Sequence, residues 1–193
     1  MTRVNNITKD LLQEMKKAGC WQICIGAESG NQAVLDFIKK EINLNQIRNT
    51  VKWSHEIGIY VKGFFMLGHP IDIIETIDET IKFAKSIPFT DVIVTIATPM
   101  PGTEFYAIAP DYGTFHDGDW LGFSYWKPAF VPRGLSEKVL YSKQRQFYKE
   151  FYFRFNIILW QLKKMQSFPQ FVKSTTNVTK VIAQSMIQKN NKQ

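Results

Sequence analysis

Cysteine is scarce in this sequence, with only Cys20 and Cys24 among 193 residues. A small secreted domain held together by disulfides would carry more, so we expect a protein of a reducing compartment, the cytoplasm. Long apolar runs are also missing. The run at residues 157–160 is far shorter than the roughly 20 residues that a transmembrane helix needs. The first 17 residues lack the apolar core of a signal peptide.

Charge is plentiful but unevenly distributed. The formal net charge is +7, which can indicate an anionic partner. Much of this charge lies in one carboxy-terminal helical stretch and a short tail, and no nucleic-acid-binding motif accompanies it, so we expect no nucleic-acid partner. The hydrophobic fraction of 45% is typical of a packed globular protein.

Hydrophobic periodicity predicts alternating strands and helices. Residues 21–28, 60–67 and 91–98 have the alternation or the β-branched and aromatic content of strands. Helical spacing follows Thr8, Gly30, Asn43 and Ile73, and Gly58 is expected to end the third helix. This order predicts an α/β fold of parallel strands joined by right-handed crossovers. The nearly continuous apolar strands predict a sheet that is covered on both faces.

The sequence changes character after about residue 105. Residues 110–134 are rich in Gly, Pro, Asp and aromatic residues, which predicts an irregular loop or short hairpin. Ser136 is expected to cap a long helix that reaches about Met165. The apolar stripe of this helix comprises Leu140, Phe147, Phe151, Phe155, Ile158 and Leu162.

Residues 20–30, CWQICIGAESG, raise the question of a metal site. If Cys20 and Cys24 both lie on an extended strand, their backbones are about 13 Å apart. Two thiolates on one zinc ion lie within about 4 Å of each other. The next candidate ligand, His55, follows a whole helix. We therefore expect no metal ligand here and interpret Cys24 as a small buried residue.

Glu28 lies at the carboxyl end of its predicted strand, where parallel α/β folds bind ligands. A carboxylate there can accept hydrogen bonds from two hydroxyl groups, as in a ribose diol. Ser29 can cap the next helix or donate to a ligand, and Gly26 leaves room. The alternative is that Glu28 is a surface residue and Ser29 an ordinary helix cap, and these residues alone leave both interpretations open.

Three strand ends together resemble a known family. GAESG (26–30), GFFMLGHP (63–70) and PMPGTEFY (99–106) occur in the order found in the second half of the radical S-adenosylmethionine (radical SAM) domain. The branch with cobalamin-binding members and the anaerobic magnesium-protoporphyrin IX monomethyl ester cyclase is the most similar. TRV (2–4) looks like the end of the family's third strand, and the resemblance covers residues 2–165.

The resemblance implies a partial (β/α) TIM-like barrel of about three βα units, with a strand stub at residues 2–5 and helices on the outer face. An irregular loop and a long carboxy-terminal helix would follow. We therefore expect a barrel half at residues 1–109, a connecting segment at 110–135, an amphipathic helical extension at 136–168 and a polar tail at 169–193.

The resemblance also implies a cradle for S-adenosylmethionine. Glu28 and Ser29 would contact the ribose or the methionine part, next to Gly26. On the adenine side, Met66 and the following Gly68 would form an apolar wall. The backbone around Ala97 and Thr98 would hydrogen-bond the adenine edge. None of these residues is assigned a catalytic role.

Two departures from the family pattern matter. The family usually continues Gly-x-Pro with Gly-Glu-Thr, whereas Ile71, Asp72 and Ile73 follow Pro70 here, and Asp72 is expected to cap the helix. The C-x3-C-x2-C loop that holds the 4Fe-4S cluster is absent and would lie upstream of residue 1. We therefore expect a carboxy-terminal fragment or truncated reading frame that binds no iron by itself.

Two functions stay open. The first is a fragment of a radical SAM enzyme, inactive alone, which in a complete chain helps to cleave S-adenosylmethionine to a 5′-deoxyadenosyl radical. Its partners would be the missing amino-terminal half and a small-molecule substrate, and the identity of that substrate and the use of cobalamin stay open. The second is a non-catalytic binding or interaction module that acts with a separate partner.

Two features could carry additional roles. His69 could transfer protons, but we expect it to position its loop. The basic and aromatic face of the last helix could contact a membrane surface or a partner. We expect instead that its apolar stripe packs on the barrel wall and that its cations are solvated.

Overall fold

The computed structural model describes residues 2–115, 128–155 and 157–159. The chain divides into two units, residues 1–153 and 154–193, and every element below belongs to the first. In the described ranges no helix is both long and apolar enough to cross a membrane. The elements are η1 (Val4–Asn6), α1 (Lys9–Lys17), β1 (Gln22–Glu28), α2 (Gln32–Phe37), α3 (Leu44–Ile57), β2 (Tyr60–Leu67), α4 (Ile74–Ser86), β3 (Asp91–Ile96), α5 (Glu104–Tyr112), β4 (Gly113–Phe115), β5 (Phe130–Pro132) and α6 (Glu137–Tyr152).

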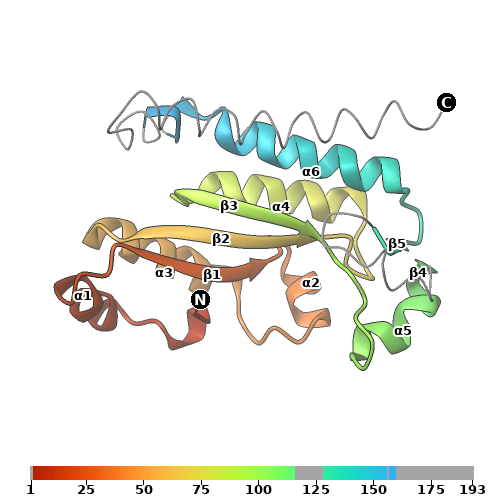
Figure 1. Cartoon of the computed structure of the whole chain (residues 1–193), viewed down its shortest axis with the longest axis horizontal. Helices are drawn as coiled ribbons and strands as arrows, with labels where there is room; N and C mark the ends of the chain where they lie inside the picture. The colour runs from red at the N-terminus through yellow and green to blue at the C-terminus, as the bar shows by residue number, and fades with distance from the viewer. Residues whose placement is uncertain (1, 116–127, 156, 160–193) are drawn as a thin grey trace. The chain divides into compact units, whose positions relative to one another are not determined.

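A parallel sheet in the order β1-β2-β3 forms the core of the first unit (Figure 1). The predicted α/β fold with parallel strands is therefore confirmed. The predicted stub at residues 2–5 shrinks to one parallel bridge between Thr2 and Ile25, because the 3-10 turn η1 begins at Val4. The strand predicted at residues 91–98 ends at Ile96.

Side chains alternate between a buried and a half-exposed face along each strand. On β1 the buried residues are Ile23, Ile25 and Ala27, and the residues between them are half-exposed. Strands β2 and β3 repeat this alternation. Within the described part of the chain only one face of the sheet is fully covered, so the prediction of two covered faces is wrong. Apolar residues such as Phe64 and Ile93 misled it, since they lie on the half-exposed face.

The helix caps follow from local sequence. The Thr8 side chain accepts a hydrogen bond from the Leu11 N–H at the start of α1. Asn43 and Gln46 form the predicted capping box of α3, and Gly58 ends that helix with a left-handed φ of 79°. These signals set where each helix begins and ends relative to its strand.

The segment after β3 is more ordered than predicted. Helix α5 was not predicted, and it crosses the predicted boundary after residue 109. Strands β4 and β5 pair in antiparallel fashion, so the short hairpin predicted within residues 110–134 is present, although residues 116–127 lie outside the described ranges.

Helix α6 begins at its predicted cap, Ser136, but ends at Tyr152 and not near Met165. Its apolar stripe is buried at Leu140, Phe147 and Phe151, and the Phe147 ring lies 5.2 Å from that of Phe65 on β2. The expected packing of this stripe on the sheet therefore holds over α6. Phe155 and Ile158 follow the end of the helix. Leu162 and the predicted tail at 169–193 lie outside the described residues.

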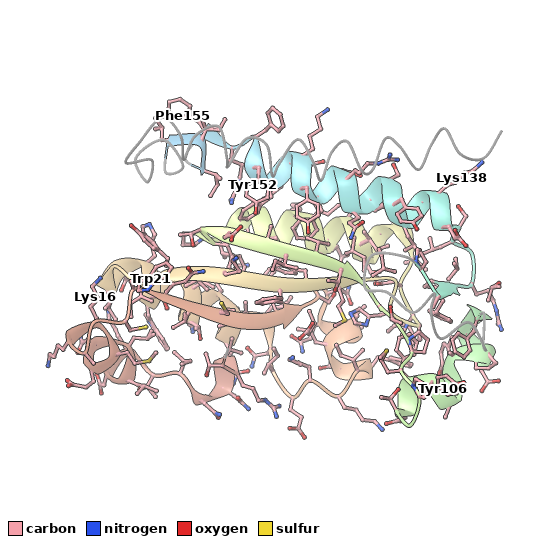
Figure 2. The ribbon with its side chains drawn as sticks, in the orientation of Figure 1. Lys16, Trp21, Tyr106, Lys138, Tyr152 and Phe155 are labelled. Atoms are coloured by element: carbon pink, nitrogen blue, oxygen red, sulfur yellow. The ribbon has the colours of Figure 1, made fainter. Side chains whose placement is uncertain are left out.

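Polar side chains of α6 close the outer edge of β3. Gln144 Nε2 donates to the Val94 carbonyl at 2.8 Å. The Tyr148 hydroxyl accepts from the Val94 N–H at 2.9 Å and donates to its carbonyl at 3.2 Å. Tyr152, which Figure 2 shows on the sheet side of α6, binds the Val92 carbonyl and the Asp91 carboxylate. Because these three side chains are spaced four residues apart, they lie on one helical stripe.

Candidate functional site

A cavity of about 570 Å³ lies at the carboxyl ends of the three parallel strands. Parallel α/β sheets bind their ligands at this end. The strand ends and the loops that follow them contribute the predicted site residues Glu28, Met66, Ala97 and Thr98, together with His69 and Pro70. A second wall, from α2 and α5, is mainly apolar and aromatic and comprises Phe37, Ile38, Phe105, Ile108 and Tyr112.

Glu28 ends β1 in an uncommon backbone conformation. Its φ is 59°, and the pairing of β1 with β2 shifts register between Gly26 and Glu28. A non-glycine residue in this region carries a conformational cost of about 1–3 kcal/mol, which proteins tolerate mainly at functional sites. The side chain is only 15% exposed, and Oε1 accepts from Lys40 Nζ at 2.6 Å.

Lys40 is a site residue that sequence reasoning missed. It lies between α2 and α3 and lines the same cavity as Glu28. Both of its neighbours, Lys39 and Glu41, have positive φ values of 53° and 56°. Arg3 holds this segment by donating to the Lys40 carbonyl at 3.0 Å. Nothing in the local sequence signals this pairing, because a helix separates Lys40 from Glu28.

A second ion pair bridges the rim of the cavity. Lys39 Nζ lies 2.6 and 2.8 Å from the two carboxylate oxygens of Glu104, at the start of α5. Both side chains are largely exposed, so solvent screens the attraction and the pair contributes little to stability. The pair nevertheless links the loop after α2 to α5 across the cavity.

Gly26 leaves room, as predicted, but the room is taken by the ion pair. A Cβ at this position would lie 2.6 Å from Glu28 Oε1 and 3.0 Å from Lys40 Nζ. Gly26 lines a smaller cavity of about 130 Å³ with Thr2, Arg3 and Lys40. A side chain at residue 26 would therefore displace the pair before it met any ligand.

Ser29 faces the protein interior and does not line the larger cavity. Its hydroxyl lies 3.1 Å from the Thr80 hydroxyl on α4 and accepts from the Asn31 N–H. Asn31, and not Ser29, caps α2 by accepting from the Val34 N–H at 3.0 Å. The structure therefore gives Ser29 a role in fastening the end of β1 to α4.

The loop after β2 is organised by Asp72. Its Oδ2 accepts from the N–H groups of Gly68 and His69, both at 2.9 Å, and its Oδ1 accepts from the Thr76 hydroxyl. The predicted capping role is wrong, because Ile73 occupies the N-cap position of α4. Gly68 has a φ of 85°, which favours glycine, and lies against Leu140 outside the cavity lining.

His69 is the buried titratable group of the cavity. Its residue exposure is 5%, and Nε2 has no hydrogen-bond partner among the residues that the structure describes. Burial lowers the pKa of His69, although the nearby carboxylates of Asp72 and Glu28 oppose this shift. The lowered pKa favours the neutral imidazole.

Metal ligands do not gather in the described ranges. No group of three or more His, Cys, Asp or Glu side chains there could hold a metal ion. Cys20 and Cys24 are both free and half-buried, and the Cys20 thiol donates to the Gln22 carbonyl at 3.6 Å.

Comparison with known families and proteins shows what this chain is similar to. Residues 1–84 match the family model of the radical SAM superfamily. The chain is therefore similar to the radical SAM superfamily over this amino-terminal part. It is similar over 76% of its length, at 28% identity, to the anaerobic magnesium-protoporphyrin IX monomethyl ester cyclase of Rubrivivax gelatinosus. It is 29% identical over 82% of its length to an uncharacterised methyltransferase of Pyrococcus horikoshii.

A solved structure has a similar fold. Methanocaldococcus infernus Elp3 with an amino-terminal deletion matches 77% of this chain with a TM-score of 0.58 and 17% identity. The match covers 31% of the Elp3 chain, 27% of the cyclase and 34% of the methyltransferase. The chain thus spans about a third or less of these proteins.

Complete radical SAM enzymes hold S-adenosylmethionine and a 4Fe-4S cluster, and the two groups fit this chain differently. The cavity offers an acidic and a basic side chain, apolar walls and a buried imidazole nitrogen without a partner, which suits a nucleoside with a charged tail. The two cysteines of the chain are too few for a cluster held by cysteine thiolates. A cluster of this kind would therefore take its ligands from outside these 193 residues.

Proposed function

We propose that this chain forms the ribose and adenine side of the S-adenosylmethionine site of a radical SAM enzyme. The observation that carries the proposal is the Glu28–Lys40 pair in the wall of a cavity at the carboxyl ends of the strands. The similarity to radical SAM proteins suggests the ligand, and the residues that line the cavity are the candidates to bind it. When bound, the cluster would supply the electron that cleaves S-adenosylmethionine, so activity belongs to the complete enzyme.

The ion pair leaves hydrogen-bonding capacity for a ligand. Glu28 uses Oε1 for Lys40, while Oε2 forms no hydrogen bond with a described residue. An ionised carboxylate has about four acceptor positions, and an ammonium group has three donors. Glu28 would therefore accept from ribose hydroxyls. Lys40 would donate to the methionine carboxylate without leaving Glu28.

The adenine ring would lie against the ends of β2 and β3. Met66 offers a polarisable apolar surface, and Ala97 and Thr98 continue β3 beyond its last paired residue. The Ala97 N–H is already used, since it donates to the Leu67 carbonyl at 2.8 Å. The adenine edge would therefore pair with backbone groups of this segment other than the Ala97 N–H.

Binding of S-adenosylmethionine to the purified chain tests the proposal. Glu28→Gln should weaken binding by about ten- to hundredfold, because hydrogen bonds to a charged acceptor contribute roughly 1.5–3 kcal/mol. Calorimetry or ligand-detected NMR gives both dissociation constants. Thermal unfolding of the same samples shows whether the variant is folded.

Two control variants separate the cavity from the rest of the chain. Glu56→Gln removes a carboxylate that pairs with Lys9 at 2.9 Å outside the cavity, and Cys24→Ala removes a half-buried thiol of β1. Both should bind S-adenosylmethionine within about twofold of the parent. If Glu28→Gln also binds like the parent, Glu28 is only a surface or structural carboxylate and the proposed ribose contact is wrong.

A further inference from the structure

His69 has a polar atom that the fold does not use. The side chain lines the cavity, yet Nε2 is buried and unpaired among the described residues. A buried polar atom without a partner costs about 1–3 kcal/mol of stability. Such an atom calls for an explanation, and a bound ligand is one that can supply the missing partner.

A purely structural role does not account for the imidazole. The loop is already fixed by its backbone, because Asp72 accepts from the N–H groups of both Gly68 and His69. Any residue with a backbone N–H at position 69 would make the same contact.

The charge and tautomer of the imidazole limit the hydrogen bonds that it can form. A neutral imidazole carries one N–H donor and one acceptor nitrogen. Glu28 lines the same cavity, and its carboxylate opposes the lowering of the His69 pKa by burial. A hydroxyl group placed between them could donate to the Glu28 carboxylate and accept from the His69 N–H, which satisfies all three groups.

We propose that His69 is a ligand-binding residue that donates a hydrogen bond from Nε2 to a ligand hydroxyl held by Glu28. The inference rests on the proposed function, which supplies the ligand class: the hydroxyl is one of the two on the ribose of an adenosine-type molecule. His69 thereby adds a neutral donor to the charged acceptor on the same sugar edge.

The test is a cycle that combines protein variants with ligand analogues. Adenosine, 2′-deoxyadenosine and 3′-deoxyadenosine are titrated into the parent chain, His69→Leu and His69→Gln, with NMR as the readout. In the parent, loss of the relevant hydroxyl should weaken binding by about tenfold. In His69→Leu, loss of the same hydroxyl should weaken binding by only about threefold or less, because one of the two partners of the hydroxyl is gone. His69→Gln keeps a donor and should recover part of the difference.

A stability measurement separates this role from a structural one. His69→Leu removes the unpaired nitrogen, so its midpoint of thermal unfolding without ligand should equal or exceed that of the parent. His55→Gln, on the exposed face of α3, is the matched control and should change neither the stability nor the hydroxyl preference. A clear loss of stability in His69→Leu, with the hydroxyl preference intact, would overturn the inference.

The outcomes also separate this inference from the proposed function. If the parent binds adenosine and Glu28→Gln weakens it, but His69→Leu keeps the full hydroxyl preference, the proposed function survives and the role of His69 is wrong. If neither adenosine nor S-adenosylmethionine binds to the parent, the proposed function fails and the role of His69 fails with it.

Discussion

The backbone groups at the two edges of the parallel sheet have different hydrogen-bond partners. At β3, the side chains of Gln144, Tyr148 and Tyr152 supply donors and acceptors to the backbone of Val92 and Val94. At the outer edge of β1, the pairing among the described residues is a single bridge from Thr2. The Thr2 N–H donates to the Cys24 carbonyl at 2.9 Å. An unpaired edge is a template for another strand.

The difference shows how one helix can replace a strand. Tyrosine hydroxyls can donate and accept at once, which is what the N–H and carbonyl of a strand residue require. A spacing of four residues on the helix matches two residues on the strand, since four helical residues rise about 6.0 Å and two strand residues about 6.6 Å. The β3 edge is thereby closed to further pairing, whereas the β1 edge accepts parallel pairing at Thr2.

Among the variants that test the two edges, Phe147→Ala should lower the free energy of unfolding most. Phe147 is fully buried and anchors α6 beside Phe65, so its removal should lower the free energy of unfolding by about 3–5 kcal/mol. Chemical denaturation measures the loss. Phe153→Ala removes a ring that is 73% exposed at the end of the same helix and should change stability by less than about 0.5 kcal/mol. Equal losses would show that α6 is not anchored by Phe147.

Tyr148→Phe isolates the polar contribution to the closed edge. The ring stays, but the Val94 N–H loses its partner, which should cost about 1–3 kcal/mol of unfolding free energy. Tyr141→Phe on the same helix is the control, because the Tyr141 hydroxyl forms no hydrogen bond with a described residue. A Tyr148→Phe variant as stable as Tyr141→Phe would mean that the edge is not closed by this hydroxyl.

Alkaline pH should also lower the stability of the β3 edge. Burial, and to a smaller extent the charge of Asp91, raise the pKa values of Tyr148 and Tyr152 above their ordinary value near 10. The folded chain therefore keeps protons that the unfolded chain loses, and the free energy of unfolding should fall as pH rises above about 10. The double variant Tyr148→Phe, Tyr152→Phe should show a shallower fall in denaturation measured at successive pH values. An unchanged slope would assign the alkaline loss to other groups.

Thr2→Pro should lower the free energy of unfolding least, because it removes a hydrogen bond at the β1 edge, which has less pairing than the β3 edge. Proline removes the N–H that donates to Cys24, so the loss should be about 0.5–1.5 kcal/mol at most. Hydrogen exchange gives a second readout, since protection should fall in β1 and stay unchanged in β3. A loss as large as that of Tyr148→Phe would make the two edges energetically alike.

The sequence predicts what depends on local chemistry. Strand β2 was predicted with its observed bounds because its residues have the β-branched and aromatic content of a strand and a glycine punctuates its end. The caps at Thr8, Asn43 and Ser136 were predicted because each is a single side chain that bonds its own helix.

Features that depend on distant contacts were missed. The Glu28–Lys40 pair requires two left-handed residues beside Lys40, and their identities do not signal that conformation. Helix α5 was not predicted, because the Gly, Pro, Asp and aromatic content of residues 110–134 indicated an irregular segment, yet Pro110 lies in the last turn of the helix. The cavity gathers Glu28, Met66, Ala97 and Thr98 as the resemblance implied, while their contacts with a nucleoside stay a prediction.

Methionine-methyl NMR tests the central claim, that the cavity binds S-adenosylmethionine, most directly. Met66 lines the cavity, whereas Met15 lies on α1, which precedes the opposite end of β1. Titration of S-adenosylmethionine into chain labelled at its methionine methyl groups should shift the Met66 signal saturably and leave Met15 unchanged. The Met66 shift should need a higher ligand concentration in Glu28→Gln. A Met66 signal that stays fixed while S-adenosylmethionine binds would contradict the account.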